Sequence, residues 1–541
     1  MRDEDRILIV GPPGTGKTRT LEGHSEEEIA RGVKPQEILA ITFTRAARQE
    51  FLGRLKHRFG FSSKDLPWVR TIHSTCYLLL GGREVLGGRI VDGKKLAEFE
   101  KLTGYAFSER EEINPEDYEI PEAMLATLGD WYLHFHDWWR NLCYRDPESA
   151  LRDFERTHDL PPEWSNKEAL RFIERYEAWK NREGLYDFTD LLVEVWQRKL
   201  CPEGIRVFFH DEAMDVSPLQ FRVARMWEEQ AERSYYAFDP DQSIYGFQGA
   251  DPSLVLGLKG KIEFLSQSKR VPRKPRDLAL KIIKHNKIRY HADWEPASEG
   301  GFVEFDAEKH DLPFEEWVKA GKRVFVLHRT RWLASRFADF LSELGIPFGS
   351  LRRRESPLEK GSREAVRIMH KLCAGEGVPL PELVKVIEKY IPSKPYMDHG
   401  AKSALPVLAE KEPDLIVDKD RAKLRKLGFT EAFMSRLNEE DFWEVLKIPD
   451  EEKEYFRNCV KKYGWEILED EPKILNGTIH SAKGRECDIV VINPNITKRP
   501  YEALFSDPEP ERRVWYVAAT RCREGIVLLQ PESTRYFEPG W

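Results

Sequence analysis

The sequence predicts an α/β protein with two parallel β-sheets, each interrupted by a mostly helical insertion. Short apolar runs alternate with helical patterns in two regions of the chain, which is typical of parallel strands joined by crossover helices. In the first region the apolar runs cover residues 7–10, 37–43, 206–210 and 233–238. The second region begins near residue 262, and its runs cover residues 323–330, 478–494 and 526–531.

The segments between these runs have a helical pattern, which predicts the insertions. In the first of them, Trp131, His134, Phe135 and Trp138 share one helix face. Such a face favours a packed core, and a base-stacking surface is the alternative. The histidines there indicate a metal site only weakly, because no further ligand pattern accompanies them. The expected division is a first sheet domain in residues 1–79 and 187–265 with an insertion in 80–186, and a second sheet domain in 266–350 and 471–541 with an insertion in 351–470.

The composition is that of a charge-rich globular protein. Of the 541 residues, 33% are charged and 41% are hydrophobic, and the formal net charge is -8. A bound nucleic acid would therefore have to meet a local basic track, so the net charge neither supports nor excludes one. The seven cysteines are widely spaced without a Cys-x-x-Cys pair, which argues against a disulfide framework or a zinc ribbon. Without a membrane-length apolar run or a signal peptide, we expect a soluble, cytoplasmic protein with no membrane partner.

Residues 11–20, GPPGTGKTRT, follow the first predicted strand and precede a helical pattern. They contain the phosphate-loop pattern G-x-x-x-x-G-K-[ST], whose glycines let backbone N–H groups surround phosphate oxygens at a helix N-terminus. Lys17 is expected to contact the β- and γ-phosphates of ATP, and Thr18 to bind Mg²⁺. A simple Gly/Pro turn is the alternative interpretation. The predicted nucleotide-binding residues of this loop are Gly11, Pro12, Pro13, Gly14, Thr15, Gly16, Lys17, Thr18 and Arg19.

Two adjacent acids, Asp211 and Glu212, come directly after the apolar run at 206–210. An ATP site needs one carboxylate at a neighbouring strand end to hold Mg²⁺ and a second one to polarise the attacking water. We therefore assign Asp211 to the metal and Glu212 to the water. An N-capped surface helix would explain the same residues if the phosphate loop were absent.

Further stretches resemble, in the correct order, the motifs of the UvrD/Rep/PcrA type of superfamily 1A DNA helicases. They are ILAITFTRAARQEF (38–51), VRTIHS (69–74), DFTDLL (187–192), DPDQSIYGFQGADP (239–252), SQSKR (266–270), VLHRTRWLASRFADFLSELGIPF (326–348), TIHSAKGRECDIV (478–490) and ERRVWYVAATRCRE (511–524). The resemblance implies two RecA-like P-loop NTPase domains, with a 1B-like first insertion and a reduced 2B-like second insertion. It implies an ATP-dependent 3′–5′ helicase or translocase that acts on single-stranded or 3′-tailed duplex DNA and hydrolyses ATP between the two domains. It identifies no protein partner.

The resemblance also assigns residues outside the phosphate loop and the acidic pair. Gln242 would orient the attacking water, and Glu486 would accept hydrogen bonds from the ribose. Arg270 and Arg521 are expected in the second domain, where they would contact the γ-phosphate only when the domains close; structural salt bridges are the alternative. Lys269 stands where the family has an adenine-stacking tyrosine. The predicted DNA contacts are the stacking residues Phe43, Tyr245 and Phe247 and the phosphate ligands Thr44, His73, Arg329, His480 and Ser481.

The chain departs from the family pattern in several places. Met214 replaces the glutamine usual after the acidic pair, and Ser268-Lys269 replace an Asn-Tyr pair before Arg270. The sequence begins only six residues before its first predicted strand, so we expect no upstream glutamine motif and weak selectivity for the nucleobase. The short second insertion leaves its regulatory role open.

Two other functions compete with a DNA helicase. An RNA helicase would share most of these motifs, although the THS-like and QSIYGF stretches favour the DNA branch. A nucleotide-switched clamp or translocase would remodel protein–DNA complexes without strand separation. Assays of unwinding and of single-strand translocation distinguish these functions.

Overall fold

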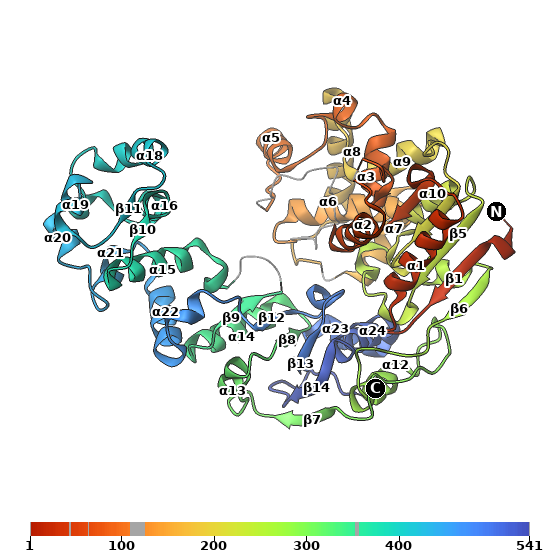
Figure 1. Ribbon diagram of the computed structural model, residues 1–541. Coiled ribbons are helices and arrows are strands. Elements are labelled where there is room, and N and C mark those ends of the chain that lie inside the picture. The colour runs from red at the N-terminus through yellow and green to blue at the C-terminus, as the bar shows by residue number, and fades with distance from the viewer. Residues whose placement is uncertain are drawn as a thin grey trace. The chain divides into compact units, whose positions relative to one another are not determined.

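The computed structural model describes residues 2–42, 45–62, 64–108, 125–158, 160–351 and 356–539. Within them the chain forms two compact units, each built on one six-stranded parallel sheet (Figure 1). The first unit runs to Gly300 and also includes Arg499–Thr520 and the last described residue, Pro539. The second unit comprises Gly301–Lys498 and Arg521–Glu538. The chain thus leaves the first unit and returns to it.

The sheet of the first unit has the strand order β3-β2-β4-β5-β1-β6, and all neighbouring strands are parallel. Its strands are β1 (Arg6–Val10), β2 (Ile38–Ile41), β3 (Val69–Arg70), β4 (Val207–His210), β5 (Arg233–Phe238) and β6 (Lys261–Phe264). Every residue of β2 and β4 is buried, as expected for central strands covered by helices on both faces. The apolar run near residue 262, where the second series of runs begins in the sequence, is the edge strand β6 of this first sheet, within the expected first domain (187–265).

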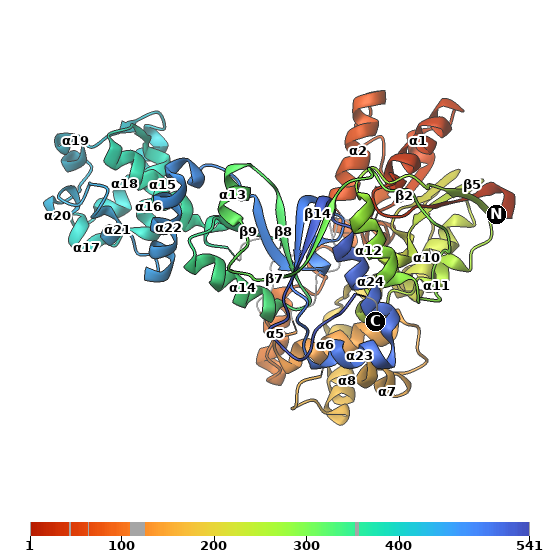
Figure 2. The ribbon, with the colours of Figure 1, turned by 90° about the horizontal axis from the view of Figure 1, so that it is seen from below.

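Helices flank this sheet and begin where the sequence supplies capping residues. Asp187 with Asp190, and Ser217 with Gln220, form capping boxes at the starts of α9 and α10. Helices α1 and α2 lie side by side (Figure 2), joined by an ion pair between Glu26 and Arg58. The helices around the sheet are α1 (Lys17–Ala30), α2 (Arg45–Phe59), α3 (Ile72–Leu79), α9 (Phe188–Arg198), α10 (Pro218–Glu228), α11 (Ser253–Leu256), α12 (Arg273–Ile283) and α24 (Pro508–Ala519), with 3-10 turns at Asp3–Asp5, Pro35–Glu37, Ala213–Asp215, Pro240–Gln242 and Gly246–Gln248.

The first insertion is helical and has an aromatic core of its own. Its helices are α4 (Gly82–Leu86), α5 (Gly93–Thr103), α6 (Leu128–Asn141), α7 (Pro147–Thr157) and α8 (Asn166–Glu183). Phe135 and Trp138 are buried in this core, and Trp131 packs against it partly buried. The core interpretation of this helix face is confirmed.

Residues 266–300 belong to the first compact unit, whereas the second domain was expected to begin at residue 266. Ser268 Oγ donates to Pro13 O at 2.8 Å, and Lys269 N donates to Gly14 O at 2.8 Å. Helix α12, which follows, packs against α24 from the other end of the chain. These long-range contacts attach the segment, including Arg270, to the phosphate loop.

The second unit repeats the architecture with the strand order β7-β14-β13-β8-β12-β9, again entirely parallel. Its strands are β7 (Phe302–Ala307), β8 (Val324–His328), β9 (Phe348–Ser350), β12 (Ile474–Thr478), β13 (Cys487–Ile492) and β14 (Cys522–Leu529), and its helices include α13 (Phe314–Lys319) and α14 (Arg331–Glu343). Helix α23 (Lys498–Ser506) begins at the last residue of this unit's longer segment. Two parallel sheets with helical insertions confirm the predicted α/β fold with two RecA-like domains.

The second insertion shares one continuous hydrophobic core with the second sheet, in which Val326 of β8 and Leu372 of α15 both take part. Its helices are α15 (Gly361–Ala374), α16 (Leu380–Tyr390), α17 (Ser393–Tyr396), α18 (Ala401–Lys411), α19 (Arg421–Lys426), α20 (Glu431–Met434), α21 (Phe442–Val445) and α22 (Asp450–Tyr463), with a two-stranded antiparallel sheet of β10 (Val378–Pro379) and β11 (Ile416–Val417) and 3-10 turns at Pro357–Glu359, Trp465–Leu468 and His480–Ala482.

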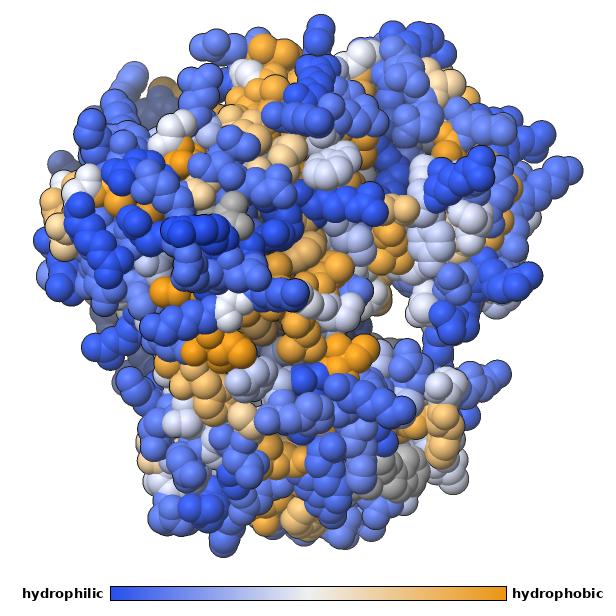
Figure 3. All heavy atoms as spheres, turned by 90° about the vertical axis from the view of Figure 1, so that its right-hand side faces the viewer, coloured by the Kyte–Doolittle hydropathy of each residue, from blue (hydrophilic) through white to orange (hydrophobic). Residues whose placement is uncertain are grey.

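Hydrophilic side chains predominate on the face shown in Figure 3, and apolar side chains form small separate groups there. Among the described helices, none is both long enough and apolar enough to cross a membrane. All seven cysteines are free thiols.

Candidate functional site

The phosphate loop connects β1 to α1 in a conformation that depends on glycine. Gly14 and Gly16 have φ of +75° and +91°, values that residues with a side chain rarely adopt. A Cβ on Gly14 would also lie 2.5 Å from Arg270 Cβ. Lys17 is buried, and its Nζ donates to Gly11 O at 2.8 Å, across the loop. Backbone N–H groups at the start of α1 and the Lys17 ammonium together provide an anion site.

The two predicted metal ligands meet in the structure. Thr18 Oγ1 donates to Asp211 Oδ2 at 2.8 Å, although the residues are 193 positions apart. Burial, together with the neighbouring charge of Glu212, raises the pKa of Asp211 to about 7. A divalent cation at this pair would offset that burial, because a hydroxyl and a carboxylate are oxygen ligands of the kind that Mg²⁺ binds.

Glu212 has a backbone conformation that its side chain does not favour. Its φ is +50° and its ψ is +40°, in the left-handed region, where a non-glycine residue costs about 1–3 kcal/mol. Its N–H donates to Asp211 Oδ1 at 2.9 Å. The tight turn therefore places two carboxyl groups with different surroundings beside the phosphate loop: Asp211 buried against Thr18, and Glu212 partly exposed.

Gln242 lies after β5, the strand between β1 and β4. Its Nε2 donates to Asp239 Oδ2 at 2.6 Å, which fixes the orientation of the amide. Burial raises the pKa of Asp239, while the charge of Lys17 opposes that shift. Lys17 therefore has acids on both neighbouring loops.

A buried ion cluster behind Gln242 was missed by the sequence analysis. Arg289 binds Asp241 Oδ2 at 2.7 Å, and both side chains are less than a tenth exposed. Arg513 of α24 lies near enough to lower the pKa of Asp241, which burial nevertheless raises to about 7. Asp239 and Asp241 follow an apolar strand just as Asp211 does, and this signal would have identified them. The two arginines have no comparable signal.

Lys269 and Arg270 are adjacent to the phosphate loop within the first unit. The backbone N–H of Lys269 is hydrogen-bonded to Gly14 O, and the Lys269 side chain is exposed. Arg270 N donates to Ser268 Oγ at 3.2 Å, and its side chain is half-buried. Both residues are therefore near the predicted nucleotide, but from the first unit and not from the second.

The predicted DNA residues of the first unit differ in accessibility. Tyr245 and Phe247 are both partly exposed, with ring centroids 6.3 Å apart. His73 is buried in α3 against Phe188, and burial lowers its pKa to about 4. Phe43 and Thr44 lie outside the described residues. Tyr245 and Phe247 form the more accessible part of the predicted surface.

The first insertion contacts this surface directly. His158 Nε2 lies 3.1 Å from Phe247 O and 3.1 Å from His134 Nε2. Burial lowers the pKa of His158 to about 4, so the histidine pair is neutral near pH 7. Asn141 Oδ1, at the end of α6, accepts from Ser217 Oγ at 2.9 Å, at the start of the helix that follows the acidic pair.

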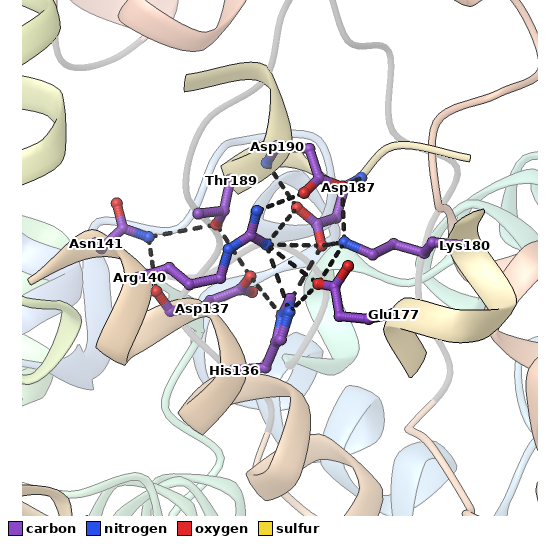
Figure 4. Close-up of polar contacts among 9 residues, drawn as sticks. All are labelled: His136, Asp137, Arg140, Asn141, Glu177, Lys180, Asp187, Thr189 and Asp190. Atoms are coloured by element: carbon purple, nitrogen blue, oxygen red, sulfur yellow. Dashed lines mark hydrogen bonds and ion pairs between the residues drawn. The ribbon is translucent and has the colours of Figure 1, made fainter. Parts of the chain in front are cut away.

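A buried ion network joins α6, α8 and the start of α9 (Figure 4). Lys180 Nζ lies 2.5 Å from Asp187 and 2.7 Å from Asp190, and Arg140 also binds both acids. Burial would raise the pKa of Glu177, but its hydrogen bond to His136 and the nearby cations lower it to about 2.

His136, Glu177 and Asp187 offer ligand atoms within 4.8 Å of one another. Lys180 and Arg140 already lie among those carboxylates, so this is an ion-pair joint neutralised by the protein's own cations. The DFTDLL stretch supplies the start of α9 to this joint.

The second unit carries the remaining predicted nucleotide residues. Arg521 is buried at the start of β14, and its Nη1 donates to Arg485 O at 3.5 Å. The neighbouring Glu486 is ion-paired with Arg523 through one carboxylate oxygen. Arg521 and Glu486 thus lie close to each other, although their loops are far apart in the sequence.

The predicted DNA residues of the second unit also share one edge. His328 pairs in register with Thr478, so Arg329 after β8 and His480 and Ser481 after β12 begin on adjacent loops. Ser481 Oγ donates to Thr478 O at 2.7 Å. His328 itself is buried, and burial lowers its pKa to about 4.

Two parallel sheets and a phosphate loop whose Thr18 meets an acid from another strand define a P-loop nucleoside triphosphatase. Residues 2–263 match the family described as the UvrD/REP helicase N-terminal domain. The chain is a helicase-class enzyme that hydrolyses ATP.

Similar proteins cover almost the whole chain. The putative ATP-dependent DNA helicase YjcD of Bacillus subtilis is 24% identical over 98% of this chain and 78% of its own length. The ATP-dependent DNA helicase PcrA of Staphylococcus epidermidis is 23% identical over 99% of this chain and 82% of its own. The probable DNA helicase II homolog of Mycoplasma capricolum is 22% identical over 96% and 82%.

Proposed function

We propose that this protein is an ATP-dependent DNA helicase or translocase that moves 3′ to 5′ on single-stranded DNA or on 3′-tailed duplex DNA. The observation that carries the proposal is the meeting of Thr18 and Asp211 beside the phosphate loop, with Glu212 held next to them in a left-handed turn. The DNA helicase names of the three similar proteins support the DNA substrate.

The first unit supplies the chemistry of hydrolysis. Lys17 and the N-terminus of α1 bind the phosphates, and Thr18 and Asp211 hold Mg²⁺, which neutralises phosphate charge when bound. Glu212 accepts a proton from the attacking water, and Gln242 orients that water through an amide fixed by Asp239. Arg270 adds a positive charge beside Gly14.

Two residues of the second unit complete the nucleotide site in this proposal. Arg521 stabilises the charge that develops on the γ-phosphate, and Glu486 accepts a hydrogen bond from the ribose. Because these residues belong to a different compact unit from Lys17, nucleotide binding and hydrolysis would change the relation between the units. That change drives translocation.

DNA contacts in this proposal lie on both units. Tyr245 and Phe247 stack on bases, and Phe247 directly follows the hydrolysis loop that contains Gln242. Arg329, His480 and Ser481 bind phosphates at the edge of the second sheet. ATP hydrolysis should therefore depend on single-stranded DNA.

Three measurements on the full chain test the proposal. Steady-state ATP hydrolysis is measured with and without single-stranded DNA, and strand separation is compared on 3′-tailed and 5′-tailed duplexes. Translocation on single strands is followed by release of a streptavidin block. DNA-stimulated hydrolysis with unwinding of the 3′-tailed duplex supports a helicase. Translocation without unwinding supports the remodelling alternative, and stimulation by RNA alone contradicts the DNA assignment.

A further inference from the structure

The loop after β8 and the first turn of α14 contain an aromatic residue that the predicted site leaves out. Thr330 caps α14 by accepting a hydrogen bond from Leu333 N, and Trp332 stands in the first turn of the helix. Ile479 N donates to His328 O at 2.9 Å, which holds the loop after β12 beside the loop after β8. Trp332 therefore lies at the carboxyl edge of the second sheet, where ligands of parallel sheets bind.

The indole ring of Trp332 is not part of the core of its unit. Helix α14 packs on the sheet through one face, on which Ala334, Phe337 and Leu341 are buried. Trp332 lies off that face and is 59% exposed. Its indole thus offers a large flat surface outside the packing that holds the helix in place.

Positive charge surrounds this ring. The guanidinium carbon of Arg336, one helical turn further on, lies 5.1 Å from the centre of the indole. Arg331 and Arg336 are exposed, and Arg329 is half-buried. The N-terminus of the 13-residue helix α14 adds its partial positive charge at the same place. A polyanion is the partner whose charge complements this surface.

We propose that Trp332 stacks on a base of single-stranded DNA, with Arg331 and Arg336 contacting the neighbouring phosphates. An aromatic face flanked by arginines is the combination that binds single strands, because every base has a stacking face and every linkage has a charge. This inference rests on the proposed DNA function and extends its binding surface beyond Arg329, His480 and Ser481. The strand bound at the edge of the second sheet thereby gains a stacking contact.

The test compares Trp332→Ala and Trp332→Phe with the unmutated protein, using fluorescence anisotropy of labelled oligo-dT at several salt concentrations. Trp332→Ala should weaken binding about 5- to 150-fold, the range for one base stack. Trp332→Phe, which keeps a stacking ring, should lose much less. Trp332→Ala should leave the slope of log affinity against log salt unchanged, whereas Arg331→Ala or Arg336→Ala should reduce it by about 0.7.

Two controls separate this inference from a folding defect and from the proposed function. Trp196→Ala removes an indole that is 39% exposed on α9 and should bind oligo-dT normally. Replacing bases of the oligonucleotide by abasic sites should reduce its affinity for the unmutated protein more than its affinity for Trp332→Ala. If the unmutated protein binds no single-stranded DNA, the proposed function is wrong. Two results would contradict only the stacking inference, provided that the unmutated protein binds single-stranded DNA. One is that Trp332→Ala binds oligo-dT within twofold of the unmutated protein, and the other is that Trp332→Ala loses affinity for blunt duplex DNA as much as for oligo-dT.

Discussion

The two sheets have the same all-parallel architecture but opposite chemistry at their carboxyl edges. In the first unit, Asp211, Asp239 and Asp241 are buried at the ends of β4 and β5, and the charge of Lys17 acts on Asp211 and Asp239. In the second unit, the corresponding edge has a neutral network in which His328 Nε2 lies 2.8 Å from Asn476 Oδ1 and its Nδ1 lies 3.2 Å from Asn493. Arginines and hydroxyl groups follow these strands.

This difference shows that the fold provides a place for ligands while the residues after the strands determine which ligand binds. Buried carboxylates carry a cost that a metal ion and a lysine offset, so the first edge suits a metal–triphosphate. A neutral buried network carries no such cost and leaves the exposed arginines to attract phosphates.

The largest expected effect concerns the acidic edge. Glu212→Gln should lower DNA-stimulated ATP hydrolysis by about 10²- to 10⁴-fold, because it removes the group that we propose takes the proton from water. Binding of a fluorescent ATP analogue should persist, since Lys17 and Thr18 are unchanged. Lys17→Ala is the matched control and should weaken nucleotide binding as well. Hydrolysis near the unmutated rate in Glu212→Gln would remove Glu212 from the mechanism.

The second prediction concerns the neutral edge and its pH dependence. Burial lowers the pKa of His328 to about 4, below its unfolded value of about 6.5. The unfolded chain therefore binds more protons between these values, and the stabilisation is present above pH 6.5 and lost as the pH falls toward 4. The loss amounts to about 3 kcal/mol at most.

Hydrogen exchange of the β8 and β12 amides in the full chain, corrected for intrinsic exchange rates, measures this loss. Protection should fall between pH 6.5 and 4.5 in the unmutated protein. His328→Asn, which keeps a hydrogen-bonding amide beside Asn476 and Asn493, should flatten the fall. The buried His73 of the first unit, whose pKa burial also lowers to about 4, provides an internal comparison. An equally steep fall in His328→Asn would assign the pH dependence to other groups.

The third prediction concerns Phe247, which connects the hydrolysis loop to the predicted DNA surface. Phe247→Ala should reduce DNA stimulation of ATP hydrolysis more than it reduces the DNA-free rate, since one base stack is worth about 1–3 kcal/mol. Phe247→Tyr, which keeps the ring, is the control. Equal basal and stimulated rates in the unmutated protein would contradict the link between the two sites.

Sequence patterns predicted the elements whose signals are local. Strand and helix periodicity gave both sheets, and spacing gave the phosphate loop and its partner Asp211, because a parallel sheet necessarily brings strand ends to one edge. The meeting of Thr18 and Asp211 follows from that rule.

The errors concern contacts between distant residues. Arg270 was expected in the second domain, but Ser268 binds Pro13 over 255 positions and attaches this segment to the first unit. The contact between His158 and Phe247 O spans 89 positions and likewise has no sequence signal. Periodicity indicates which face of a helix or strand is buried. It does not indicate which distant segment packs against that face.

The smallest expected effect is discrimination between nucleobases at the acidic edge. Among the described residues next to the phosphate loop, Lys269 and Arg19 present exposed cationic side chains. Arg6 is committed elsewhere, with its Nε 2.7 Å from Glu228 Oε1. A cation can lie across the face of any purine, whereas reading the base edge requires paired donors and acceptors whose mismatch costs orders of magnitude. GTP should therefore support hydrolysis within about tenfold of ATP in kcat/KM.

Steady-state rates with ATP, GTP, CTP and UTP at saturating single-stranded DNA measure this ratio of kcat/KM values. Lys269→Tyr should shift the ratio toward ATP if stacking at this position orders the base. A preference for ATP of about a hundredfold or more, roughly 2.7 kcal/mol, in the unmutated protein would show that the adenine edge is read by other groups.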